Sequence, residues 1–217
     1  MNVEQARFNM IEQQIRPWDV LDGSVLSLLA SVRREDFVPE QYKALAFVDT
    51  EVPLPNGQSM LAPKVEARLL QELAVDRQAT VLEIGTGSGF MAALLGRRAR
   101  QVVTLEIDDK LAALARSNLQ RAGVGNVTVR HMDGSRGLSG EAPFDAILLS
   151  GSVAEVPPTL LAQLKVGGRL AAIVGQEPVM RATLFTRGAE HGFSSVELFD
   201  TVAPRLRNFG EPSRFRF

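Results

Sequence analysis

A turn rich in glycine follows an apolar stretch near the middle of the chain. The segment 81–90 reads VLEIGTGSGF, in which Gly85, Gly87 and Gly89 alternate with small polar residues. Because glycine has no Cβ atom, the backbone of such a turn can come close to a ligand. The dinucleotide fingerprint G-x-G-x-x-G would need glycine at Phe90, so the pattern disfavours a nicotinamide-dependent oxidoreductase. The pattern predicts a nucleotide-like ligand at a strand-to-helix turn, and an ordinary glycine-rich turn is the alternative.

Acidic side chains lie at or just beyond the ends of three apolar runs, at Glu83, Glu106 and Asp133. The carboxyl ends of successive parallel strands form the edge at which open sheets bind ligands. Glu106 comes about 20 residues after the first glycine, the separation at which a carboxylate can accept hydrogen bonds from a ribose diol. The alternative is an acid that favours a helix start, but Asp108 and Asp109 already supply that charge. We therefore predict that Glu106 is a ribose ligand.

Asp133 follows the third run and precedes a glycine, Gly134. Its carboxylate could accept a hydrogen bond from an exocyclic amine such as that of adenine. Alternatively, the pair is only a turn. The two histidines, His131 and His191, lie at a strand end and in a predicted hairpin turn, and we expect neither to be catalytic.

The elements that must position these residues can be read from the pattern of apolar runs. Short β-branched or aliphatic runs alternate with stretches that can form helices, which predicts a parallel sheet with flanking helices. The last two runs, ATLFTRG and FSSVELFDTV, are separated only by AEHG, which is too short for a crossover and suits an antiparallel hairpin. The expected strands are the runs ATVLEIG, QVVTLEI, NVTVRHM, FDAILLS and GGRLAAIVG, followed by the hairpin.

The first third of the chain lacks the alternation of strand and helix patterns. Residues 3–16 carry apolar side chains at helical spacing before Pro17, and a second amphipathic helix is expected around residues 25–32. Residues 49–63 hold three prolines and lack a sustained period, so they predict a loop or short extended segment that enters a helix at 64–73. We expect a single domain, 1–217, with a helical cap and loop (1–63) and a ligand-binding core (64–217).

Composition restricts the classes of function. The chain has 217 residues, 45% of them hydrophobic, which is enough for a full core without help from metals or partners. Its 24 basic and 25 acidic residues leave a net charge of -1, which disfavours a nucleic acid substrate. It has no cysteine, which excludes disulfides and thiolate zinc sites, and we predict no metal site.

The amino terminus lacks a continuous apolar stretch, so we expect no membrane segment and a cytoplasmic protein. The oligomeric state cannot be read from the sequence.

Five segments in order resemble the motifs of class I S-adenosylmethionine-dependent methyltransferases: VLEIGTGSGF, TLEID, MDG, APFDAILLS and LKVGGRLAAIVG. Within that class, VRREDFVPE and DTEVPLPNGQSMLAP resemble the protein-L-isoaspartate (D-aspartate) O-methyltransferase family across nearly the whole chain. The resemblance implies an α/β, doubly wound, Rossmann-like fold with a seven-stranded, mostly parallel sheet, an antiparallel carboxy-terminal hairpin and an amino-terminal helical segment. It also implies methyl transfer from S-adenosyl-L-methionine, which leaves S-adenosyl-L-homocysteine, to isoaspartyl residues of damaged proteins or peptides.

By this resemblance, Glu106 holds the ribose, Asp133 meets the adenine, and Ser150 borders the methyl donor and acceptor. Ser59 and Asp49 are the candidate catalytic residues. The full set of expected cofactor-binding residues is Glu83, Gly85, Thr86, Gly87, Ser88, Gly89, Glu106, Ile107, Asp133, Gly134 and Ser150.

One position departs from the family pattern. The family carries T-I-S-x-P in the acceptor loop, whereas this chain has Ser59-Met60-Leu61-Ala62-Pro63, so leucine stands where the family has serine. Leucine cannot donate a hydrogen bond, and Ser59 is the possible substitute because residues two apart in an extended segment point the same way. Lys64 could attract an anionic acceptor. Two alternatives stay open: methyl transfer to a different acceptor, including a small molecule, and a cofactor-binding module without turnover.

Overall fold

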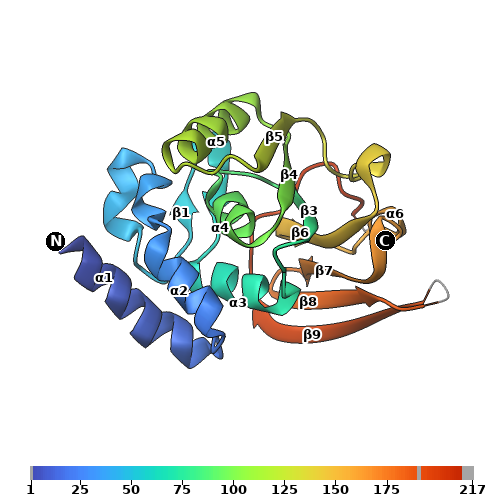
Figure 1. Ribbon diagram of the computed structural model, residues 1–217, viewed down its shortest axis with the longest axis horizontal. Helices are drawn as coiled ribbons and strands as arrows, with labels where there is room; N and C mark the ends of the chain where they lie inside the picture. Colours follow the sequence, from blue (N-terminus) through green and yellow to red (C-terminus); the bar gives the residue numbers. More distant parts are fainter. Residues whose placement is uncertain (1, 190–191, 212–217) are drawn as a thin grey trace, which may run out of the picture.

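A seven-stranded sheet forms the centre of the computed structural model, which describes residues 2–189 and 192–211 (Figure 1). The strand order is β5-β4-β3-β6-β7-β8-β9; β3 to β7 run parallel, and β8 and β9 are antiparallel. The fold class expected from the sequence is confirmed, including the final hairpin, although residues 190–191 of its turn, and with them His191, lie outside the described residues. The strands are β3 (Thr80–Ile84), β4 (Gln101–Glu106), β5 (Val127–His131), β6 (Phe144–Val153), β7 (Leu164–Gln176), β8 (Val179–Arg187) and β9 (Phe193–Thr201).

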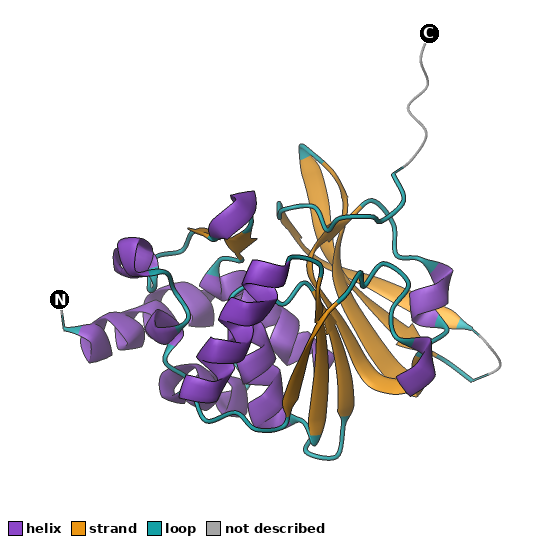
Figure 2. Cartoon of the chain, turned by 90° about the horizontal axis from the view of Figure 1, so that it is seen from above, coloured by secondary structure: helices purple, strands orange, loops and turns teal. Residues whose placement is uncertain are grey.

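The two faces of the sheet are covered unequally (Figure 2). Three helices pack on one face: α3 (Pro63–Leu73), α4 (Phe90–Arg98) and α5 (Asp109–Arg121). On the other face, the crossover from β5 to β6 contains only a 3₁₀ turn (Ser139–Glu141), and that from β6 to β7 only the short α6 (Pro158–Leu161). The expectation of helices between the strands is thus met fully on one face only.

Strand alternation divides the core into two layers. Successive side chains of a strand point to opposite faces, so Val81 joins the cluster under α3, α4 and α5, while Leu82 joins the cluster on the other face. Both side chains are fully buried. Strands buried on both faces read as continuous apolar runs, which is why these segments were recognisable from sequence.

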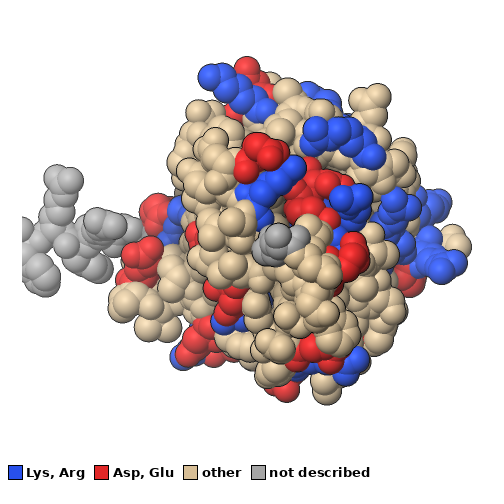
Figure 3. Space-filling model, turned by 90° about the vertical axis from the view of Figure 1, so that its left-hand side faces the viewer, with Lys and Arg blue, Asp and Glu red and all other residues tan. Residues whose placement is uncertain are grey.

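The amino-terminal third forms a helical cap beside the sheet (Figure 1). It contains α1 (Val3–Met10), which continues as a π-helical turn (Ile11–Ile15), a 3₁₀ turn (Arg16–Trp18), α2 (Gly23–Ser31) and further 3₁₀ turns at Arg34–Asp36 and Glu40–Leu45. A two-stranded ribbon follows, of β1 (Val52–Pro53) and β2 (Ser59–Met60), joined by a 3₁₀ turn (Pro55–Gly57). Acidic and basic side chains alternate on the face of the molecule that carries the amino terminus (Figure 3). No helix in the described part of the chain is long and apolar enough to cross a bilayer.

Candidate active site

The glycine turn after β3 has a backbone that favours glycine at three positions. Gly85, Gly87 and Gly89 all have positive φ, at 93°, 53° and 86°, and residues with a Cβ rarely adopt such angles. A Cβ on Gly87 would lie 3.2 Å from Leu54 Cδ1. Asn118 of α5 holds the turn by donating its side-chain N–H to the Ser88 carbonyl at 2.8 Å. The turn is therefore held by Asn118 and packed against the Leu54 side chain.

Glu106 fastens this turn to the end of β4. Its carboxylate accepts the Gly87 N–H at 2.8 Å and the Asp108 N–H at 3.0 Å. Asp108, rather than Glu106, caps α5 by accepting the N–H groups of Lys110 and Leu111. Because a carboxylate has about four lone-pair sites, Glu106 can accept further hydrogen bonds from the cavity that it lines.

A cavity lies at the carboxyl ends of β3, β4, β5 and β6, the edge at which open parallel sheets bind ligands. Asp133 lies on its wall, where the Asn208 side chain donates to it at 2.8 Å and the Ser135 N–H at 2.8 Å. Burial alone would raise the pKa of Asp133, but these hydrogen bonds hold it below its ordinary value. The cavity is lined by Gln58, Ser59, Ile84, Gly85, Gly87, Leu105, Glu106, Ile107, Leu111, Asp133, Gly134, Ser150, Leu206, Arg207 and Phe209.

The carboxy-terminal segment after β9 covers one side of this cavity. It is attached to the end of β6 through Ser152, whose N–H donates to Pro204 O at 2.7 Å and whose carbonyl accepts the Leu206 N–H at 2.9 Å. Leu206 then reaches the glycine turn, because a Cβ on Gly85 would lie 2.9 Å from Leu206 Cδ2. The sequence did not single out Leu206, Arg207 or Phe209, since the segment has no period and no chemical signature.

A second cavity adjoins the first, and Ser59, Gly85, Gly87 and Ser150 line both. Its floor holds Glu83, which is fully buried and accepts hydrogen bonds from Thr104 at 2.7 Å and Ser150 at 2.8 Å. Burial raises the pKa of Glu83 to about 8, against the effect of these two hydrogen bonds. The second cavity is lined by Leu54, Ser59, Met60, Leu61, Glu66, Glu83, Gly85, Thr86, Gly87, Ser88, Phe90, Met91 and Ser150.

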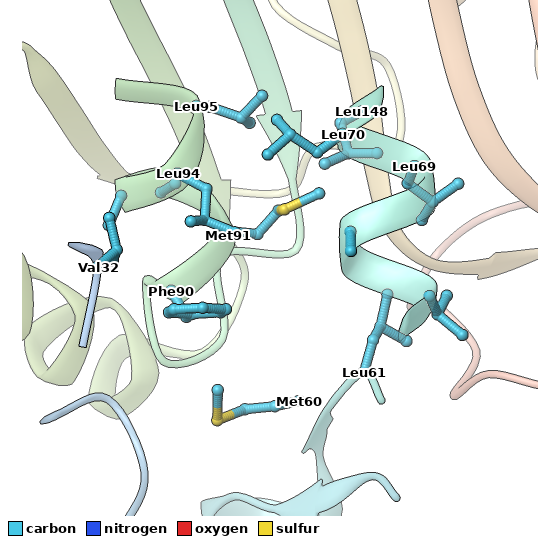
Figure 4. Close-up of a cluster of buried hydrophobic side chains, with 14 of the residues drawn as sticks. Val32, Met60, Leu61, Leu69, Leu70, Phe90, Met91, Leu94, Leu95 and Leu148 are labelled. Atoms are coloured by element: carbon cyan, nitrogen blue, oxygen red, sulfur yellow. The ribbon is translucent and has the colours of Figure 1, made fainter. Parts of the chain in front are cut away.

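Leu61 forms part of the wall of the second cavity and is buried in the core. Figure 4 shows it with Met60 and Phe90 in the cluster of apolar side chains between α3 and α4. Its carbonyl accepts a hydrogen bond from Arg34 at 2.8 Å, and the same guanidinium pairs with Glu66. Arg34 is 1% exposed. Burial raises the pKa of Glu66 to about 7, although Arg34 opposes this rise. The position where the family has serine is therefore an anchored, apolar one.

Most of the expected site residues meet at this edge of the sheet. Gly85, Gly87, Glu106, Ile107, Asp133, Gly134 and Ser150 line the first cavity, and Glu83, Thr86 and Ser88 line the second. Two of the expected residues line neither cavity. Gly89 is the N-cap of α4, and a Cβ there would lie 3.3 Å from Ala115 of α5, so the glycine also allows the close approach of these two helices. Asp49 also lines neither, and its carboxylate pairs with Lys64 at 2.7 Å.

A family model described as protein-L-isoaspartate(D-aspartate) O-methyltransferase (PCMT) matches residues 5–200. The chain belongs to this family. A protein-L-isoaspartate O-methyltransferase of Koribacter versatilis is 42% identical over 210 residues, which cover 96% of this chain and 94% of that protein. Protein-L-isoaspartate O-methyltransferase 2 of Marinobacter nauticus is 40% identical over 213 residues, 97% of each chain. Family membership confirms the expected resemblance, the enzyme class and the use of S-adenosylmethionine.

Solved structures show the same fold. One, a protein-L-isoaspartate O-methyltransferase, superposes with a TM-score of 0.79 at 24% identity, covering 94% of this chain and 67% of that one. A Plasmodium falciparum protein assigned to the same enzymes, solved with S-adenosyl-L-homocysteine, gives a TM-score of 0.76 at 21% identity, covering 95% of this chain and 99% of that one. At these identities the likeness supports the fold.

Proposed function

We propose that this member of the PCMT family transfers the methyl group of S-adenosylmethionine to the carboxylate of isoaspartyl residues in proteins or peptides. One observation carries the proposal: a cavity with carboxylates for an adenosine adjoins a second cavity, and the two share Ser59, Gly85, Gly87 and Ser150 in their walls. A donor in the first cavity and an acceptor in the second would meet at that junction.

The residues of the first cavity fit an adenosine. Glu106 has lone pairs for a ribose diol beyond those used by two backbone N–H groups, and Asp133 has a carboxylate held ionised near Gly134 for an exocyclic amine. The Gly85 and Gly87 backbone lines the same cavity beside them. When bound, the cofactor supplies a methyl group that its sulfonium already activates. The protein's task is then to hold an acceptor oxygen in line with it.

A carboxylate acceptor needs no base from the protein, since its ordinary pKa near 4 leaves it ionised at neutral pH. Ser59 is the polar side chain of the acceptor loop at the junction. We propose that the whole chain, 1–217, acts as one methyltransferase domain, in which residues 1–63 form the cap and acceptor loop and 64–217 the cofactor-binding core.

A second candidate function keeps the chemistry and changes the acceptor. It is favoured by Leu61, which is 5% exposed and presents no hydrogen-bonding group to the second cavity. A different carboxylate, a hydroxyl or an amine on a small molecule would then be the acceptor.

The test is incubation of the protein with an isoaspartyl peptide and S-adenosylmethionine labelled in its methyl group. The matched control is the same peptide with a normal aspartyl residue. We expect a base-labile methyl ester on the isoaspartyl peptide alone. No ester on either peptide, under conditions in which a known isoaspartyl methyltransferase is active, would contradict the proposal and favour the second candidate.

A further inference from the structure

Ser59 lines both cavities, but its hydroxyl proton is donated to a residue that lines neither of them. Its hydroxyl donates to Glu51 Oε2 at 2.8 Å. An ionised carboxylate only accepts hydrogen bonds, so the Ser59 hydroxyl is left with lone pairs alone for any other partner. Glu51 is partly exposed and does not line either cavity, so it lies behind Ser59 rather than in the space for the acceptor.

The segment that carries this pair is firmly held. In the β1–β2 ribbon, Pro53 is paired with Ser59, which brings the residue before the ribbon, Glu51, beside the serine hydroxyl. The tip of the ribbon is fixed to the start of α5, because Asn56 donates its side-chain N–H to Asp108 at 2.6 Å. The orientation of Ser59 is therefore set by its carboxylate partner on a fixed backbone.

The Thr86 and Ser150 hydroxyls of the second cavity belong to a separate network around Glu83. Ser150 is hydrogen-bonded to Glu83 at 2.8 Å, and Thr104, which also contacts Thr86 at 2.6 Å, is hydrogen-bonded to Glu83 at 2.7 Å. Because burial raises the pKa of Glu83 to about 8, its carboxyl group holds a proton at neutral pH and donates it within this network. The Ser59–Glu51 hydrogen bond does not involve Glu83, so the direction of the Ser59 proton depends on Glu51.

We propose that Glu51 is a positioning residue that turns the lone pairs of Ser59 toward the acceptor, and that Ser59 binds the backbone N–H next to the acceptor carboxylate. In an isoaspartyl residue the free α-carboxylate and the backbone N–H are attached to the same carbon, so one side chain at the junction can bind the N–H while the oxygen faces the methyl donor. This recognition differs from donation to the carboxylate, which Leu61 cannot provide. The inference depends on the proposed function.

The experiment compares an isoaspartyl peptide with the same peptide methylated on the isoaspartyl nitrogen. One hydrogen bond to a neutral group contributes about 0.5–1.5 kcal/mol, which corresponds to a change of about two- to tenfold. In the parent protein we expect KM for the N-methylated peptide to rise by about that factor, with kcat little changed. Glu51→Ala should raise KM for the unmodified peptide and remove the discrimination between the two peptides, while the Kd for S-adenosyl-L-homocysteine stays within about twofold.

Glu51→Gln is the conservative control, because its amide oxygen can still accept the Ser59 proton, and it should restore the discrimination. Equal KM values for both peptides in the parent would overturn the proposal even if Glu51→Ala failed to fold, and so would discrimination that persists in a folded Glu51→Ala protein. A parent inactive on both peptides would instead overturn the proposed function and, with it, this mode of recognition.

Discussion

Replacing Glu83 with glutamine should change how stability depends on pH. The Glu83 side chain is fully buried, and its pKa rises from the ordinary 4.5 to about 8 because burial disfavours the charged form. Since its pKa is higher in the folded state, the folded protein holds a proton that the unfolded chain releases between these values. The stability that this proton provides is complete below about pH 4.5 and is lost as the pH rises through about 8.

The magnitude follows from the size of the rise. Each pKa unit corresponds to about 1.4 kcal/mol, so a rise of about 3.5 corresponds to about 5 kcal/mol between low pH and pH above 8. Between pH 5.5 and 8.5 about 3 kcal/mol of this is lost. Glutamine does not titrate and can still accept a hydrogen bond from Thr104 or Ser150. The free energy of unfolding of Glu83→Gln, relative to that of the parent, should therefore rise by about 3 kcal/mol from pH 5.5 to pH 8.5.

The assay is urea unfolding of both proteins at matched pH values, with the difference in the free energy of unfolding taken at each pH. This difference removes the effect of Glu66, whose pKa is also raised, to about 7, and which is present in both proteins. A difference that stays constant from pH 5.5 to 8.5 would mean that Glu83 titrates in the same way in the folded and unfolded states, which contradicts a raised pKa for the buried carboxyl group.

Three further predictions concern the glycine turn and the acceptor loop. Gly87→Val should abolish binding of S-adenosyl-L-homocysteine, measured by calorimetry, while the protein stays folded. The reason is that φ of Gly87 is 53° and a Cβ there would lie 3.2 Å from Leu54 Cδ1, so valine would change the shape of the turn. Retained affinity would argue against this turn as the binding site. Arg34→Met should lower the free energy of unfolding, measured in urea, by about 3–5 kcal/mol, because it leaves the buried Glu66 carboxylate without its ion-pair partner. A loss below about 1 kcal/mol would show that the ion pair is unimportant for stability. Leu61→Ser should lower the free energy of unfolding by about 2–5 kcal/mol in the same assay, since it removes apolar atoms and puts a hydroxyl where Leu61 is 5% exposed in the core cluster. A neutral effect would mean that the loop repacks.

The sequence predicted the sheet and the glycine turn at its edge for a physical reason. Strands buried on both faces must be apolar throughout, and a ligand turn needs positive φ, so both leave direct traces in residue type. The contrast between Glu106 and Asp108 was also predictable, because a helix needs one N-cap acceptor and Asp108 takes that position. Gly89 could not be interpreted from the sequence in the same way. A glycine indicates that there is no room for a Cβ atom, but not whether a ligand or a neighbouring residue such as Ala115 occupies that room.

Other parts of the site depend on contacts between distant segments. Leu206 reaches the cavity only because Ser152 holds the backbone of the carboxy-terminal segment, and a backbone anchor can be formed by many side chains. The Arg34–Glu66 pair joins residues 32 positions apart, and neither position has a local pattern that indicates burial. The direction of the Ser59 hydroxyl likewise depends on Glu51, across the turn of the ribbon.

The central claim is that an adenosine-bearing cofactor lies along the edge of the sheet, with its ribose on Glu106. Calorimetric titration with S-adenosyl-L-homocysteine of the parent and of Glu106→Ala tests this most directly. We expect one site in the parent and an affinity at least about tenfold weaker in the variant, because hydrogen bonds to a charged group contribute about 1.5–3 kcal/mol. A folded parent that binds no S-adenosyl-L-homocysteine, or equal affinity in the two proteins, would contradict it.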